Sequence, residues 1–453
     1  MDRPQPDVAP GRLTAAEIER NFQDLHPPLS KSEALIAADR CYFCYAAPCT
    51  TACPTGIDIP RFIQSIRSGD VEGAARTILS ENIMGGMCAR VCPTEVLCEQ
   101  ACVRNVHEDK AVDIGLLQRY ATDPVFASGE QLFDRAEPSG RRVAVVGGGP
   151  AALSCAHRLA WLGHEVTIFC RDGKLGGLNE FGIAAYKTVD DFAQREVAYI
   201  LSIGGIEVRA GIALGRELSL AQLCRSHDAV FLAVGLAGVN ALGLESEGLP
   251  GVVDAVQYIA ELRQARNRTQ LPVGRRVVVI GGGMTAIDVA VQSKRLGADD
   301  VTIVYRRGRE QMGASRFEQE LAQVSGVRIR HWARPVRLVG KEHVTRVEFE
   351  HTHIGADGRL EGTGETFALQ ADVVFKAIGQ EIDWAELGAA SRVLRVSNGR
   401  IEVDADRKTS LDNVWAGGDC VAGGQDLTVT AVQDGKLAAR SIDRYLRSDG
   451  GIS

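Results

Sequence analysis

The sequence predicts an α-helical, cysteine-rich N-terminal domain followed by an α/β region with two Rossmann-like dinucleotide-binding units. Eight of the 12 cysteines fall between Cys41 and Cys102, among short helical segments broken by Gly and Pro. Two segments, beginning at Arg141 and Arg275, each contain an apolar strand, a Gly-rich turn, a helix and a second apolar strand. The chain has 453 residues, which suits two or three domains.

The composition of the chain argues against several classes of function. The hydrophobic content of 45% and charged content of 24% are those of an ordinary globular protein, and the net charge of −7 argues against nucleic-acid or anionic-membrane binding. The apolar stretch from Arg142 to Leu162 is interrupted by Gly-Gly-Gly-Pro, His157 and Arg158, and the N-terminus lacks a signal-peptide pattern. We therefore expect a cytoplasmic protein with reduced thiols.

The domain order follows from these patterns. We expect a loosely ordered, Pro-rich arm over residues 1–30, a helical cysteine-rich domain over 31–125 and a linker from Phe126 to Ser139. The first dinucleotide domain is then split into 140–236 and 376–453, around an inserted second dinucleotide domain at 237–375.

The clustered cysteines form two runs. They are Cys41-x2-Cys44-x4-Cys49-x3-Cys53-Pro and Cys88-x3-Cys92-Pro-x5-Cys98-x3-Cys102. Zinc sites usually use two Cys-x2-Cys pairs, and only Cys41 and Cys44 form one here. Tight runs with Cys-Pro are typical of iron–sulfur binding, so we expect two clusters in preference to zinc or structural thiols.

The first dinucleotide segment predicts a bound FAD. The Gly turn at 147–149 follows a strand and opens a helix, whose N-terminus favours a pyrophosphate. A second Gly pair at 176–177, a strand ending at Gly235, and the NVWAGGDC stretch before a helix near Thr428 are typical of two-dinucleotide flavoproteins. The predicted contacts are Gly147, Gly149, Pro150, Ala151, Ala152, Gly176, Gly177, Leu178, Gly235, Gly418, Asp419, Thr428 and Val429, and Lys187 is also assigned to cofactor binding.

One position departs from the usual pattern. The second strand of this segment ends in Cys170, where an acidic residue commonly binds the adenosine ribose. Two interpretations stay open. Either Asp172 takes that role, or Cys170 is merely tolerated and FAD is held elsewhere.

The second dinucleotide segment predicts a nicotinamide cofactor. After its second strand come Tyr305, Arg306 and Arg307, with no acid at the ribose position. Arginines there suit the 2′-phosphate of NADP, although a solvated strand end is the alternative. The predicted contacts are Gly281, Gly283, Met284, Thr285, Ala286, Arg306, Arg307 and Gly379.

Three stretches resemble the N-terminal domain of the dihydropyrimidine dehydrogenase family, which also occurs in the small subunit of glutamate synthase. They are RCYFCYAAPCTTACPTGIDIPRFIQSI, ENIMGGMCARVCPTEVLCEQACVRN and VDIGLLQRYA, and the resemblance continues from about Arg40 over nearly the whole chain. It implies one [4Fe–4S] cluster on Cys41, Cys44, Cys49 and Cys102, and another on Cys53, Cys92, Cys98 and Gln118, with Cys88 spare. It also implies NAD, which conflicts with the arginines, so NADH and NADPH both stay open.

The resemblance implies a function for this helical iron–sulfur domain and α/β flavoprotein. Neither dinucleotide segment has a neighbouring Cys-x2-Cys pair, so we expect electrons to leave FAD through the two clusters. The chain contains no FMN-binding barrel, so we expect a hetero-oligomer with an FMN-containing partner that interconverts uracil or thymine and 5,6-dihydropyrimidines. No side chain is assigned a catalytic role. The alternatives are the small (β) subunit of glutamate synthase, an NAD(P)H–ferredoxin-type electron-transfer subunit and a non-catalytic relay or redox sensor; the APCTTACPTGIDIP stretch favours the pyrimidine family.

Overall fold

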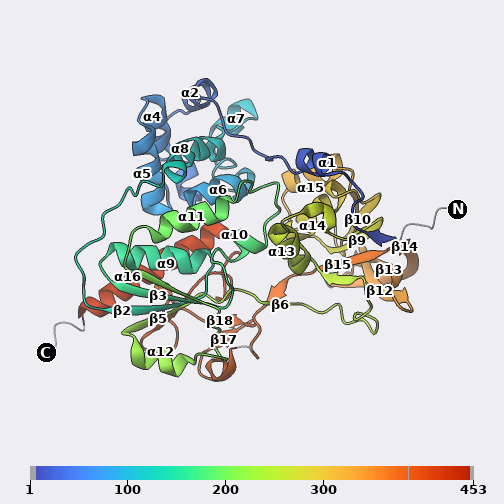
Figure 1. Ribbon diagram of the computed structural model, residues 1–453. Helices are drawn as coiled ribbons and strands as arrows, with labels where there is room; N and C mark the ends of the chain where they lie inside the picture. Colours follow the sequence, from blue (N-terminus) through green and yellow to red (C-terminus); the bar gives the residue numbers. More distant parts are fainter. Residues whose placement is uncertain (1–6, 386, 449–453) are drawn as a thin grey trace. The chain divides into compact units, whose positions relative to one another are not determined.

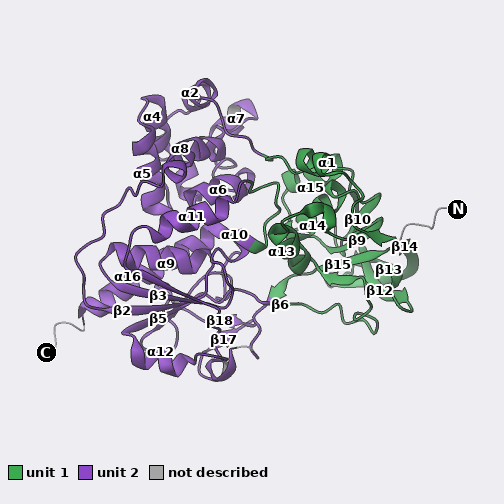
Figure 2. Cartoon of the chain, viewed as in Figure 1, with its two compact units in different colours: residues 1–25, 181–189, 239–380 green, residues 26–180, 190–238, 381–453 purple. Residues whose placement is uncertain are grey.

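The computed structural model describes residues 7–385 and 387–448, which divide into two compact units. Unit 1 comprises residues 1–25, 181–189 and 239–380, and unit 2 comprises 26–180, 190–238 and 381–453 (Figure 2). Within the described ranges, no helix is both long and apolar enough to cross a membrane.

The first part of unit 2 is helical, as predicted. Ser30 begins its first helix with a capping box to Glu33, and Asp58 and Asp70 cap two later helices. Apolar side chains on one face of the 59–67 helix, including Phe62 and Ile66, are buried in the core of this domain. The elements are α2 (Lys31–Asp39), α3 (Pro48–Ala52), α4 (Ile59–Arg67), α5 (Val71–Glu81), α6 (Gly85–Val91), η1 (Thr94–Val96), α7 (Arg104–Glu108) and α8 (Ile114–Ser128).

Helix α8 continues past residue 125, where we expect the domain to end and a linker to start. Phe126 is buried, and its ring meets Phe192 and Tyr199 edge-on at centroid distances of 5.5 Å and 5.2 Å. This packing keeps the last turn helical, and Gly129 then ends the helix in a left-handed conformation. The irregular connection to the α/β region therefore starts later than the composition suggests.

The second part of unit 2 is a parallel five-stranded sheet of order β19-β5-β2-β3-β4. Helices α9 and α16 cover one face, and α12 lies on the other (Figure 1). The elements are β2 (Arg142–Val146), α9 (Pro150–Trp161), β3 (Glu165–Cys170), α10 (Leu178–Phe181), α11 (Phe192–Leu201), β4 (Ile206–Ala210), α12 (Leu220–Ser226), β5 (Ala229–Leu232), η4 (Gly388–Arg392), β17 (Val396–Ser397), β18 (Arg400–Ile401), β19 (Val414–Ala416) and α16 (Thr428–Ser448).

Unit 1 repeats this plan with a parallel sheet of order β11-β10-β9-β15-β7 and an added antiparallel sheet, β12-β13-β14. Along β9, Val277 and Val279 pack in the core shared with the helices, whereas Val278 and Ile280 pack in the core shared with the antiparallel sheet. The elements are β7 (Val252–Asp254), α13 (Ala255–Gln264), η2 (Arg268–Gln270), β8 (Val273–Gly274), β9 (Arg276–Gly281), α14 (Met284–Arg295), β10 (Asp300–Val304), η3 (Arg309–Gln311), α15 (Arg316–Val324), β11 (Arg328–Arg330), β12 (Ala333–Gly340), β13 (Val344–Ile354), β14 (Leu360–Gln370) and β15 (Val373–Ala377). The short strands β6 (Gly238–Val239) and β16 (Gln380–Glu381) each span a point where the chain passes from one unit to the other. The predicted fold class, a helical domain followed by two Rossmann-like units, is confirmed.

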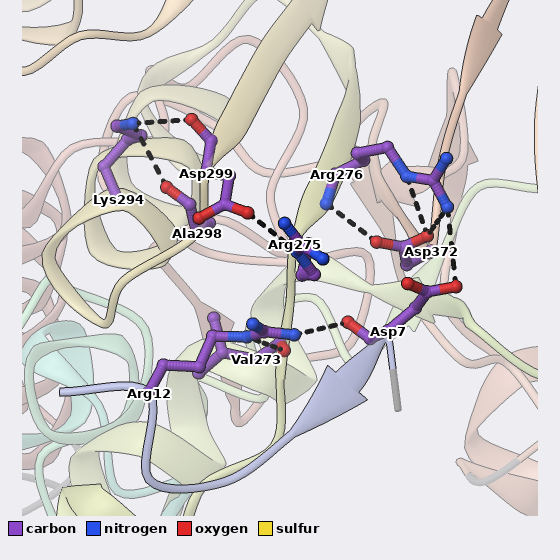
Figure 3. A network of polar contacts seen from close by, with 9 residues as sticks. All are labelled: Asp7, Arg12, Val273, Arg275, Arg276, Lys294, Ala298, Asp299 and Asp372. Atoms are coloured by element: carbon purple, nitrogen blue, oxygen red, sulfur yellow. Dashed lines mark hydrogen bonds and ion pairs between the residues drawn. The ribbon is translucent and has the colours of Figure 1, made fainter. Parts of the chain in front are cut away.

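Residues 7–25 differ from the loose arm that we expect over 1–30; residues 1–6 lie outside the described residues. Strand β1 (Val8–Ala9) pairs with β8, and α1 (Ala15–Asn21) begins with a Thr14–Glu17 capping box. Polar side chains that suggest disorder instead form a network at the amino ends of the unit 1 strands (Figure 3). Arg12 donates to the carbonyl oxygens of Val273 and Asp7 at 3.0 Å and 2.7 Å, and Arg276 Nε donates to Asp372 at 3.0 Å. This end is opposite the Gly turn, so the network has a structural role.

Candidate cofactor sites

The first group of thiols surrounds one apolar cavity in the helical domain. Cys41, Cys44, Cys49 and Cys102 all line it, together with apolar side chains that include Ile59 and Val112. Cys102 is far from the other three in sequence, and the fold brings it to them. Burial, with a smaller contribution from the Cys41 and Cys102 thiols, raises the pKa of Cys49 to about 11. Four sulfurs in an apolar setting are the donor set of an iron–sulfur cluster, whose cationic iron offsets the cost of thiolate burial.

The second group consists of Cys53, Cys92 and Cys98. A hydrogen bond with the Cys88 thiol, followed by burial and the nearby thiols of Cys98 and Cys53, holds the pKa of Cys92 well above its usual range. Burial raises the pKa of Cys98 in the same way. In residues 7–385 and 387–448, no three His, Cys, Asp or Glu side chains are grouped closely enough to hold a single metal ion.

Gln118 and Cys88 both lie near helix α6, which ends just before Cys92. Gln118, on α8, is buried and donates from Nε2 to the carbonyl oxygen of Gly85 at 2.7 Å. This bond occupies the amide nitrogen, and the side-chain oxygen is the atom with which an amide binds metal. Cys88 is also buried and touches Cys92 directly. The fold thus places Cys88 beside Cys92 and places Gln118 at the first residue of α6.

The first Gly turn lies between β2 and α9. Gly147 has φ of +122°, and a side chain there would overlap the carbonyl oxygen of Ala233, at the end of β5. Gly149 is the N-cap of α9, Pro150 is the first helical residue, and no side chain caps this N-terminus. These features leave a helix N-terminus open to an anion, as a dinucleotide pyrophosphate requires.

The predicted second Gly pair lies directly on this turn. The Gly176 N–H donates to the Gly148 carbonyl at 2.7 Å, and a Cβ atom at Gly177 would lie 2.6 Å from the Gly149 Cα. Leu178, the next residue, is partly exposed at the start of α10. The loop and the turn therefore form one backbone surface.

The start of α16 closes the same region. Thr428 is its first residue and donates from Oγ1 to Asn179 at 2.7 Å, while Val429 is buried. Gly418, with φ of +79°, donates its N–H to Asp434 at 2.9 Å and approaches Ala151 of α9. Gly235, with φ of +63°, has open space where a side chain would be.

Asp419 follows Gly418 and is mostly buried. Burial raises its pKa to about 7; Asp426 and Asp434 push the pKa upward, and Arg400 opposes them. A carboxyl group with this pKa can accept or donate a hydrogen bond near neutral pH, which suits contact with a polyhydroxyl chain.

The position usually held by a ribose-binding acid is filled by a thiol. Cys170 ends β3, is buried, and has its Sγ atom where a Cβ at Gly148 would lie 2.6 Å away. Asp172 is half-buried and pairs with Arg171 at 3.4 Å. Both interpretations of this departure remain compatible with this arrangement.

The second Gly turn, between β9 and α14, repeats this geometry. Gly281 has φ of +150°, and a side chain there would overlap the carbonyl oxygen of Ala377, at the end of β15. Gly283 is the N-cap of α14, again with no side-chain cap, and is followed by Met284, Thr285 and the buried Ala286. Gly379 has φ of +96°, and its carbonyl oxygen accepts a hydrogen bond from the Asn240 N–H at 3.2 Å.

A loop that the motifs did not indicate lies on the second turn. The Ala314 N–H donates to the Gly282 carbonyl at 3.0 Å, and a Cβ at Gly313 would lie 3.8 Å from the Gly283 Cα. Gly313 and Ala314 therefore correspond to the Gly pair at 176–177. Matching the two repeats beyond their strands could have found this loop, because a glycine follows the second strand in each.

Arg306 and Arg307 lie just after β10, the neighbour of β9. Arg306 is exposed and Arg307 half-buried, and their carbonyls accept from Thr352 Oγ1 and the Trp332 N–H at 2.8 Å and 3.2 Å. Among the described residues neither guanidinium has a hydrogen-bond or ion-pair partner. Their backbone is held while their charges stay available for a ligand.

Lys187 is placed differently from the other predicted contacts. It lies in the 181–189 segment of unit 1, is buried, and has Nζ at 2.7 Å from both Asp288 Oδ1 and Glu318 Oε1. These two carboxylates raise its pKa against the effect of burial. Asp288 also accepts from the Ala184 N–H at 3.1 Å. The Lys187 side chain thus fastens this segment to α14 and α15, and lies in neither Gly turn.

Family models match both parts of the chain. Residues 18–130 match dihydropyrimidine dehydrogenase domain II, 4Fe-4S cluster, and residues 141–435 match pyridine nucleotide-disulphide oxidoreductase. Two solved structures share the fold. They are FprA from Mycobacterium tuberculosis in complex with NADPH (TM-score 0.59, 19% identity, 70% of this chain and 86% of that one) and T. acidophilum thioredoxin reductase (TM-score 0.53, 22% identity, 68% and 99%).

Two full-length relatives are equally similar. The NAD-dependent dihydropyrimidine dehydrogenase subunit PreT of Salmonella typhimurium is 34% identical over 432 residues, covering 94% of this chain and 98% of that protein. The glutamate synthase [NADPH] small chain of Escherichia coli is 34% identical over 467 residues, covering 98% of each. The chain therefore belongs to the pyridine nucleotide-disulphide oxidoreductase family, in the branch that carries an N-terminal 4Fe-4S domain and includes these two subunits.

Proposed function

We propose that this chain is the NADH- or NADPH-oxidising subunit of a bacterial-type dihydropyrimidine dehydrogenase. When bound, FAD would supply the exchange between a hydride and single electrons, and two [4Fe–4S] clusters would supply single-electron conduction. The observation that carries this proposal is that four thiols from separated parts of the sequence line one apolar cavity, in a chain that also has two open Gly turns.

The residues divide by the group that each would hold. We assign the pyrophosphate of FAD to the turn at Gly147–Gly149 with its covering loop, and the nicotinamide cofactor to the turn at Gly281–Gly283. In both, backbone N–H groups and a helix N-terminus would bind phosphate, and the close approach of glycines would leave room for it. Asp419 and the start of α16 would orient the flavin.

We assign Cys41, Cys44, Cys49 and Cys102 to one cluster, and Cys53, Cys92, Cys98 and Gln118 to the other. The cavity supports the first set. The orientation of the Gln118 amide supports the second, although the contact between Cys88 and Cys92 favours the competing ligand Cys88. An amide is neutral, so a cluster with Gln118 would carry one negative charge less than an all-thiolate cluster.

The acceptor is proposed to be a separate FMN-containing subunit that interconverts uracil or thymine and their 5,6-dihydro forms. The name of the PreT relative as a subunit supports a partner, and the name of its enzyme supports the pyrimidine reaction. We also propose a cytoplasmic location, because all twelve cysteines are free.

The glutamate synthase small subunit is the competing proposal, because that relative is just as similar. Its name specifies NADPH, and the unpartnered Arg306 and Arg307 suit a 2′-phosphate. The two proposals agree on the chemistry of this chain and differ in the partner that receives the electrons.

The test uses the purified, cofactor-loaded chain. With NADH or NADPH it should bleach flavin absorbance and reduce an artificial dye, but it should reduce uracil only after addition of the FMN-containing partner. Uracil reduction by the chain alone would overturn the division between subunits. Dye reduction without uracil reduction in the presence of that partner, but with glutamate formation in the presence of a glutamate synthase large subunit, would favour the competing proposal.

A further inference from the structure

A buried ammonium group lies close to the second group of thiols. Lys436 is in the middle of α16, and its side chain is only 3% exposed. Its Nζ atom donates to the carbonyl oxygen of Thr55 and to Glu81 Oε2, both at 2.7 Å. Burial lowers the pKa of Lys436, and Glu81 opposes that fall. A lysine this deeply buried needs specific hydrogen-bond partners. One of the two partners here is a backbone carbonyl oxygen in the cysteine-rich domain.

Thr55 connects this charge to a cysteine. Its Oγ1 atom lies 3.3 Å from the Sγ atom of Cys53, and Thr55 is itself buried. The ammonium group is therefore separated from the Cys53 thiol by a single residue, in a region from which solvent is excluded. Screening by water and salt is weak in such a place, so a unit charge acts strongly on its neighbours.

The surrounding charges leave an excess of positive charge. Glu81 also faces Arg440, at 3.9 Å, and Arg158, which donates to the carbonyl oxygen of Ser80. One carboxylate thus faces three cations. Glu81 and Arg440 are partly exposed, with side-chain exposures of 36% and 46%, whereas the Lys436 side chain is almost fully buried.

We propose that Lys436 raises the reduction potential of the cluster that Cys53 helps to hold. This inference rests on the proposed function, which assigns Cys53 to a cluster. Reduction adds a negative charge to a cluster, and a nearby fixed positive charge stabilises the reduced state. Helix α16 begins beside the first Gly turn and carries Lys436 two turns further on, so the same helix supports the flavin region and tunes the cluster.

The experiment is an EPR-monitored redox titration of the cofactor-loaded protein. Lys436→Met should reduce the ratio of reduced to oxidised cluster about ten-fold at a fixed solution potential, a shift of about 59 mV for one electron, for one cluster and not the other. Glu81→Gln, which removes the opposing charge, should move the same cluster in the opposite direction. Lys436→Arg should keep the wild-type potential, and the exposed Arg440→Met should change the ratio less than about two-fold.

The opposite directions of these two potential shifts distinguish an electrostatic effect of Lys436 on the cluster from a purely structural role. If Lys436 only holds the two segments together, Lys436→Met and Glu81→Gln will both loosen the same contact and shift the potential in the same direction, or not at all, and either result overturns the proposal. Should Lys436→Met fail to fold, Glu81→Gln and Lys436→Arg still decide it. About eight iron atoms per chain with unmoved potentials would contradict only the role of Lys436. About four iron atoms with no cluster dependent on Cys53 would overturn both this inference and the two-cluster proposal.

Discussion

The two Gly turns have nearly the same backbone and different surroundings. In each, the first glycine has a positive φ and meets the carbonyl oxygen that ends a neighbouring strand, and the third glycine begins a helix of 12 residues. Around the first turn lie Cys170, the start of α16 and the buried Asp419. Around the second lie Tyr305 and two unpartnered arginines.

Under the proposed assignment, each turn would bind a pyrophosphate, and the residues that flank the turn would select the rest of the cofactor. The glycines are needed for backbone approach in both units, so they carry no information about flavin or nicotinamide. Instead, we expect the arginines after β10 and the start of α16 to distinguish a nicotinamide cofactor from a flavin. Variants of matched positions in the two turns can therefore separate the two sites.

The largest expected effects come from the first glycine of each turn. Gly147→Ala and Gly281→Ala each place a methyl group on a backbone oxygen and demand a positive φ from a non-glycine residue. Gly147→Ala should yield protein without FAD. Gly281→Ala should keep FAD, while reduction by NADH or NADPH falls about 100-fold or more.

Flavin content and stopped-flow flavin bleaching measure the two outcomes. Gly399→Ala, at a positive φ with open space around it, is a control for backbone strain alone. Loss of FAD in Gly281→Ala with retention in Gly147→Ala would reverse our assignment of the two sites.

An intermediate effect is expected from the arginines. Replacing Arg306 and Arg307 by Asp and Ser should weaken NADPH binding about 10- to 100-fold and NADH binding much less, because a phosphate contact is lost and a repulsive charge is added. The KM values for both cofactors measure this. Arg337→Ser, an exposed arginine of β12, is the control. Equal changes for NADPH and NADH would show that the pair does not contact a 2′-phosphate.

The smallest expected effects come from the two loops that cover the Gly turns, and these effects should differ between the loops. Gly177 has a positive φ and is tightly packed on Gly149, so Gly177→Ala should lower stability as well as FAD retention. Gly313 has an ordinary φ and room for a methyl group, so Gly313→Ala should leave the melting temperature unchanged and weaken NADH or NADPH only a few-fold. A melting temperature lowered by Gly313→Ala as much as by Gly177→Ala would contradict this difference.

The sequence predicts the turns and the thiol runs well because their constraints are local. A glycine that must follow a strand and precede a helix, or a cysteine three residues from another, is visible in a short window. The position of Lys187 could not be predicted in this way, because its partners Asp288 and Glu318 lie more than 100 residues away. The same holds for residues 7–25, whose polar side chains suggest disorder until their ion-pair partners in unit 1 are known.

The contact between Lys436 and Thr55 is a second long-range feature of this kind. It joins positions 381 residues apart, and no spacing pattern indicates it. The helix that contains it is predictable, but the element against which one face of that helix packs is set by the tertiary fold.

The most direct test of the account is the cofactor content of the protein purified under anaerobic conditions. Iron, acid-labile sulfide and flavin are measured on the same sample, together with bleaching of the flavin by NADH or NADPH. We predict about eight iron atoms and one FAD per chain, with complete bleaching. About four iron atoms, or a flavin that neither nicotinamide cofactor reduces, would contradict the claim that this chain joins two clusters to an NAD(P)H-reducible flavin.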